Sequence, residues 1–131
     1  MSEHTLTRNL VGALALAGAA LLPAAAIADG PQATATASNH AGLAAQAADM
    51  NGVRMHLHHV LNCLVGPGGN GFDAAPGNPC ANAGGGAIPQ TADAAQKTKL
   101  ETAATRVRAA IANNDVAATK MAATEVSAML K

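Results

Sequence analysis

The feature that most constrains the fold is the stretch of residues 66–90, which holds eight of the chain's thirteen glycines and four of its six prolines. Both residue types interrupt regular backbone structure, so neither a helix nor a strand is expected here. A structureless loop of this length is uncommon in a compact domain unless it is anchored or functional. The sequence therefore predicts a long loop that something holds in place.

The chain has two cysteines, Cys63 and Cys80, and they bracket the first part of this loop. In an exported protein an even number of cysteines favours a disulfide. Closing a loop of this size stabilises a fold by about 3 kcal/mol through the entropy of the unfolded chain. We predict a Cys63–Cys80 disulfide, and the alternative is that one or both thiols bind a metal.

Residues 1–28 are predicted to be a secretory signal peptide. An uncharged apolar run extends from Leu10 to Leu22, and the small residues Ala26 and Ala28 follow at the two positions that a signal peptidase recognises. The run is too short to span a membrane comfortably, although an uncleaved anchor is the alternative. Cleavage before Asp29 would release a periplasmic or secreted protein that keeps no membrane segment.

The composition of residues 29–131 excludes one partner and leaves others open. Seven basic and seven acidic residues balance, and Trp and Tyr are absent. Without a basic stripe or aromatic residues that stack on bases, nucleic-acid binding is not expected. Alanine dominates, so each helix buries little apolar area. A small domain of this kind needs a covalent link, a cofactor or a partner, and a homo-oligomer or a protein partner remains open.

The periodicity of the apolar residues predicts an all-α fold, a small up-and-down bundle of three helices, or four if Gly52 divides the first. Ser38 or Asn39 is the expected cap of the first helix, and Gly66 its C-terminal glycine. The predicted segments are, in chain order, a flexible segment (29–37), a first helix (38–65), the Gly/Pro loop (66–90), a second helix (91–113) and a third helix (115–130).

His56 and His59 lie three residues apart, so one face of the first helix presents both imidazoles. Two histidines at this spacing form half of a metal site. The further ligands would come from His40, from a methionine such as Met55 or Met121, from a carboxylate or from a second chain. Imidazole with thioether suits copper, and haem iron accepts the same pair. The predicted ligands are therefore His56, His59, His40 and Met55, for copper first or for haem.

The sequence favours a small exported helical protein that binds a transition metal or haem through these histidines. The alternative is a disulfide-stabilised structural or protein-interaction module with no cofactor, in which the histidines are polar surface residues and the Gly/Pro loop contacts a partner. No enzymatic activity is expected, because the chain lacks the nucleophile elbow, the zinc-protease helix motif and the phosphate-binding loop with its lysine.

Overall fold

The computed structural model of the chain describes residues 30–131, and the predicted signal peptide lies outside the described residues. Within residues 30–131 the regular structure is helical, with no strand. The helices are, in chain order, α1 (Gly30–Gln46), α2 (Met50–Val65), α3 (Ala87–Gln90), α4 (Ala94–Ala112) and α5 (Val116–Met129). The predicted all-α class is confirmed, with four long helices and the short α3.

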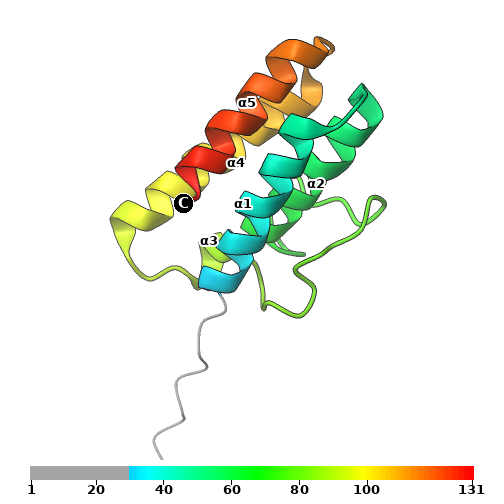
Figure 1. Cartoon of the computed structure of the whole chain (residues 1–131). Helices are drawn as coiled ribbons and strands as arrows, with labels where there is room; N and C mark the ends of the chain where they lie inside the picture. The colour runs from blue at the N-terminus through cyan, green and yellow to red at the C-terminus, as the bar shows by residue number, and fades with distance from the viewer. Residues whose placement is uncertain (1–29) are drawn as a thin grey trace, which may run out of the picture.

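The four long helices run alternately up and down and form a ring around one core (Figure 1). α1 packs against α2 and α5, and α4 packs against the same two helices. The largest fully buried side chains come from α2, α4 and α5, and include Leu57, Leu64, Leu100, Val107 and Val126. No helix among residues 30–131 is both long enough and apolar enough to cross a lipid bilayer.

Residues 30–37 are helical, so the predicted flexible segment over residues 29–37 is wrong from Gly30 onward. Pro31 lies in the first turn of α1, where a backbone N–H has no helical partner. The hydroxyl of Thr34 donates to the carbonyl of Gly30 at 2.8 Å. The fully buried side chains of α1 are all alanines: Ala33, Ala37, Ala41 and Ala44. Because polar residues lie between these alanines in the sequence, the apolar face of α1, which consists of small side chains, is not evident from the sequence.

The helix predicted over residues 38–65 is in fact two helices with a turn between them. Asp49 caps α2, because its Oδ1 accepts a hydrogen bond from the backbone N–H of Gly52 at 2.9 Å. The predicted helix is therefore interrupted before Gly52 and not at Gly52. Ser38 and Asn39, the predicted caps, lie within α1, and the Ser38 hydroxyl donates to a backbone carbonyl of α5 at 3.3 Å.

The helices predicted over residues 91–113 and 115–130 correspond to α4 and α5, and both begin at an aspartate. Asp93 Oδ1 accepts the backbone N–H three residues on at 2.7 Å. Asp115 Oδ1 makes the same contact at 2.8 Å. Since a cap residue stands outside the helix that it caps, α4 begins at Ala94, later than predicted.

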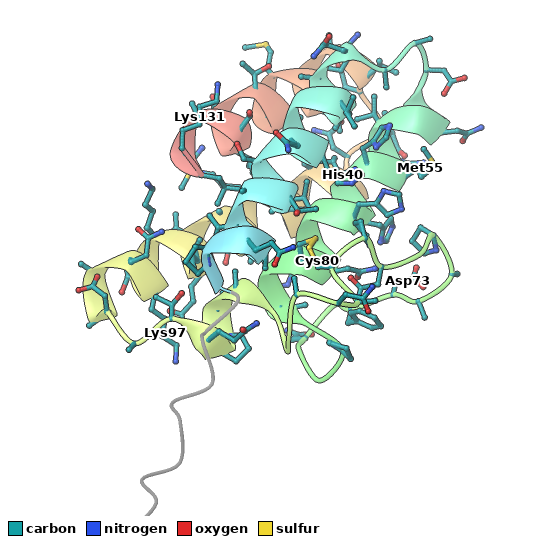
Figure 2. The ribbon with its side chains drawn as sticks, turned by 60° about the horizontal axis from the view of Figure 1, so that its bottom comes forward. His40, Met55, Asp73, Cys80, Lys97 and Lys131 are labelled. Atoms are coloured by element: carbon teal, nitrogen blue, oxygen red, sulfur yellow. A yellow bond between two sulfur atoms is a disulfide. The ribbon has the colours of Figure 1, made fainter. Side chains whose placement is uncertain are left out.

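The segment over residues 66–90 is irregular as far as Gly86 and ends in the short helix α3. Its glycine- and proline-rich composition gave no indication of this helix. The predicted Cys63–Cys80 disulfide is present, with a Cα–Cα distance of 5.2 Å. It fastens the first part of the segment to α2, and Figure 2 shows Cys80 close to the helices with Asp73 on the loop outside them. The loop is therefore anchored, as its length requires.

Candidate metal centre

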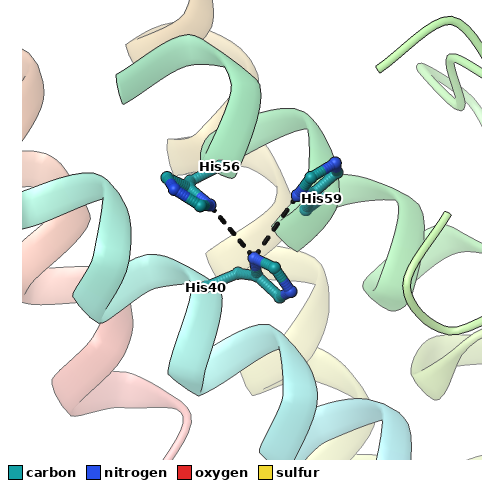
Figure 3. Close-up of side chains that lie close together, drawn as sticks. All are labelled: His40, His56 and His59. Atoms are coloured by element: carbon teal, nitrogen blue, oxygen red, sulfur yellow. Dashed lines mark hydrogen bonds between the residues drawn. The ribbon is translucent and has the colours of Figure 1, made fainter. Parts of the chain in front are cut away.

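Three histidines from two helices meet at one point on the bundle (Figure 3). His40 comes from α1, and His56 and His59 come from α2. The Nδ1 atom of His40 lies 3.2 Å from Nδ1 of His56 and 3.3 Å from Nδ1 of His59. One ligand nitrogen from each side chain lies within 4.8 Å of the other two, and all three residues are partly buried. Three of the four predicted ligands thus share one site.

The turn between α1 and α2 brings His40 to the other two. On one continuous helix, 16 residues would separate His40 from His56 by about 24 Å. The turn folds α1 back along α2 instead. The buried side chains of α1 are alanines, and such short side chains let two helices approach closely. An imidazole beside this alanine stripe can therefore reach across to the neighbouring helix.

A backbone carbonyl sets the tautomer of His59. Its Nε2 atom lies 2.7 Å from the carbonyl oxygen of Pro76. A carbonyl oxygen only accepts hydrogen bonds, so Nε2 carries the proton. In the neutral imidazole the Nδ1 atom then has a free lone pair, and this atom faces His40. Metal-ligating histidines characteristically donate their second ring N–H to such a carbonyl. Pro76 contributes a backbone carbonyl, which every residue has. The sequence therefore contains no pattern that would identify Pro76 as the partner of His59.

Two of the three imidazoles, those of His40 and His56, are held toward the neutral form. Burial lowers the pKa of His40 below the ordinary value of 6.5, and the charges that His59 and His56 would carry lower it further. Burial and the neighbouring His59 also lower the pKa of His56. A histidine must lose its proton to bind a metal, so both shifts favour the binding form near neutral pH.

The two short separations at His40 are compatible with a shared ion. His40 Nδ1 has either a proton or a lone pair, so only one of its two short contacts can be a linear hydrogen bond. Tetrahedral zinc, with Zn–N bonds of about 2.0–2.1 Å, holds two ligand nitrogens about 3.3–3.4 Å apart. The observed Nδ1–Nδ1 separations are 3.2 and 3.3 Å. A single proton on His40 Nδ1 can be shared with only one of the other two Nδ1 atoms, whereas one metal ion could accept the lone pairs of all three.

The remaining candidate residues lie differently. His58 does not join the cluster, and its Nδ1 atom lies 3.8 Å from an Asp73 carboxylate oxygen. Met55 is exposed, and it precedes His59 by four residues on α2. Cys63 and Cys80 are joined in the disulfide, so the alternative of thiol ligands does not apply.

Two surface pockets, of about 550 Å³ and about 560 Å³, lie elsewhere on the bundle. The first is lined by the end of α2, the glycine-rich loop and α4, and the second by the start of α1 and the start of α4. Neither is lined by a histidine. The three imidazoles thus form a small surface cluster rather than the wall of either pocket.

No protein-family model, curated protein or solved structure matches this chain. The case for a function therefore rests on the geometry of the histidine cluster.

Proposed function

We propose that the protein binds one divalent transition-metal ion through the Nδ1 atoms of His40, His56 and His59. The observation that carries this proposal is the pair of Nδ1–Nδ1 separations, 3.2 and 3.3 Å, around His40. Together with the predicted signal peptide, it supports the proposal of an exported protein that holds or transfers an ion.

The ligand set favours Cu(II) or Zn(II). Imidazole nitrogen suits both ions, and the general order of affinities places Cu(II) above Zn(II). The two Nδ1–Nδ1 separations at His40 lie near those that two imidazoles on one tetrahedral ion span. We therefore expect Cu(II) to bind more tightly than Zn(II).

An ion accounts for the cluster better than haem does. The Nδ1 atoms face one another at 3.2 and 3.3 Å, which leaves no room for a porphyrin between them. No carboxylate among the described residues joins the cluster. Three protein ligands leave a fourth position for water, for Met55 or for a group from a partner.

The test is a titration of purified, metal-stripped protein with Cu(II) and Zn(II) against a chromophoric competitor. We expect one ion per chain, and at least a tenfold loss of affinity when any one of the three histidines is replaced by Ala. His58→Ala is the matched control, since it removes an imidazole from the same helix outside the cluster. Met55→Ala asks whether the thioether contributes.

Two results would contradict the proposal. One is the absence of a stoichiometric ion, which would favour the disulfide-stabilised structural or interaction module. The other is a loss of affinity in His58→Ala as large as that in His40→Ala.

A further inference from the structure

Asn62 is a fully buried polar side chain on α2, one turn beyond His59. Its amide group makes three hydrogen bonds, all to the backbone of the Gly/Pro loop. Nδ2 donates to the carbonyl of Asp73 at 2.6 Å and to the carbonyl of Gly77 at 2.7 Å. Oδ1 accepts the backbone N–H of Asp73 at 3.0 Å. Both amide hydrogens and the amide oxygen are therefore used to hold one short piece of loop.

Pro76 lies inside this held piece, between the two residues that Asn62 anchors. Its carbonyl oxygen is the group that receives the Nε2–H of His59 at 2.7 Å. The disulfide at Cys80 fastens the loop to α2 three residues beyond Gly77. The position of the Pro76 carbonyl is thus set from both sides, by a buried amide and by a covalent bond.

We infer that Asn62 is a positioning residue for the metal centre, acting through the Pro76 carbonyl on His59. With the carbonyl in place, the proton of His59 stays on Nε2 and the Nδ1 lone pair stays directed at the ion. Without it, His59 populates both tautomers and more than one ring orientation, and only part of that population can bind. This inference rests on the proposed metal binding.

The same loop contains a matched control. Gln90 is also an amide that donates two hydrogen bonds to loop carbonyls, those of Ala83 and Gly86, both at 2.9 Å. These bonds hold the later part of the loop, away from Pro76. A purely structural role for Asn62 would make Asn62→Ala and Gln90→Ala alike in their effect on metal affinity, whereas a positioning role would separate them.

The first measurement is the affinity of the full chain for Cu(II) and Zn(II), again against a competitor. Outer hydrogen-bonding partners of a metal ligand contribute roughly 10–100-fold to affinity, and because Asn62 holds such a partner without itself contacting His59, we expect a loss at or below the lower end of that range, about tenfold or less, for Asn62→Ala. Gln90→Ala should bind as the unmodified protein does. In a chain that already carries His59→Ala, adding Asn62→Ala should cause no further loss.

Gly77→Ala provides a variant that leaves the buried amide in place. Gly77 has a φ of 99°, which alanine adopts only under strain, and its added Cβ would lie 3.7 Å from His59 Nε2. The substitution should displace the adjoining Pro76 peptide within a loop that the disulfide still closes. We expect it to weaken metal binding in the same direction as Asn62→Ala, so it decides the question if Asn62→Ala fails to fold.

The second measurement needs no metal. Nitrogen-15 NMR of the histidine rings, recorded above the pH at which they titrate, reports which nitrogen of His59 carries the proton. We expect the Nε2–H form in the unmodified protein and in Gln90→Ala, and a mixture of forms in Asn62→Ala and Gly77→Ala.

The results separate this inference from the proposed function. If the unmodified protein binds metal and Asn62→Ala binds it as tightly as Gln90→Ala does, the inference is wrong and the proposed function stands. If Asn62→Ala does not fold, the same result in Gly77→Ala overturns the inference. If the unmodified protein binds no metal, the proposed function fails. The NMR measurement still decides whether Asn62 sets the tautomer, and an unchanged His59 tautomer in Asn62→Ala overturns the inference in either case.

Discussion

The two halves of the segment between α2 and α4 are made of similar residues but serve different purposes. Residues 66–80 lie against α2, are closed by the disulfide and touch the histidine cluster through Pro76. Residues 81–90 meet the end of α2 backbone to backbone, and a Cβ atom on Gly66 would lie 1.7 Å from the carbonyl oxygen of Gly85. Whether a loop positions a candidate site or only packs against the bundle therefore depends more on the residues that it contacts than on its composition.

The two halves also differ in how they are anchored. Asn62, which holds the earlier half, is fully buried, whereas Gln90, which holds the later half, is partly exposed. An unsatisfied buried group costs more than an exposed one, because water cannot replace the lost partner. The earlier half is therefore the more tightly specified of the two, and it is the half that reaches a candidate ligand.

Removal of the disulfide should have the largest effect. We expect Cys63→Ser with Cys80→Ser to lower the free energy of unfolding by about 3 kcal/mol, the value for closing a loop of this size. Metal affinity should fall as well, because the Pro76 carbonyl is then held by Asn62 alone. Denaturant unfolding of the metal-free protein and the competitor titration measure the two effects. Lower stability with unchanged affinity would show that the disulfide supports the fold and not the site.

The contact between Gly66 and the later half should produce the next largest effect. Gly66 has a φ of 70°, and a Cβ atom there would overlap the Gly85 carbonyl. We expect Gly66→Ala to cost about 2 kcal/mol of stability through overpacking and backbone strain. Gly85→Ala is the control, since nothing lies within 4 Å of its added Cβ, and it should change stability by less than about 0.5 kcal/mol. Similar losses in both variants would argue against the close approach.

Much of the fold can be predicted from local sequence features such as helix caps and residue spacing. Gly66 ends α2 because it can adopt a positive φ, and Asp115 begins α5 because its carboxylate accepts a helix N–H. The spacing of the two cysteines around a glycine-rich loop predicts their pairing. The spacing of His56 and His59 predicts that their side chains share a face, because helix geometry alone decides it.

The rest depends on contacts that have no local signature. Alanine favours helix everywhere, so the sequence suggests one helix through residues 38–65, and only the Asp49 cap reveals the turn that brings His40 to the site. The stripe of small residues in α1 resembles a polar segment, because its alanines alternate with Ser and Thr. Pro76 contributes through its backbone carbonyl, so its side chain carries no information about that role.

The smallest effect that we predict concerns pH, and its sign follows from the two shifted histidines. The pKa values of His40 and His56 are lowered from 6.5 by burial first and then by neighbouring histidine charge. As the pH falls through about 6.5, the unfolded chain therefore binds protons before the folded protein does. This contribution to stability is complete above that pH and is lost progressively as the pH drops to the lowered folded pKa values.

Solvent reaches both side chains and screens their charges, so we expect a smaller change than either the disulfide or the Gly66 variant produces. The measurement is the free energy of unfolding, without metal, between about pH 8 and about pH 5, which lies above the range in which the capping aspartates titrate. His40→Ala with His56→Ala should flatten the decline, because the groups that take up the protons are gone. Gln90→Ala, which alters only the later half of the loop, should decline as the unmodified protein does. An equal decline in the double histidine variant would locate the pH dependence outside the cluster and remove one reason to regard its imidazoles as poised for metal.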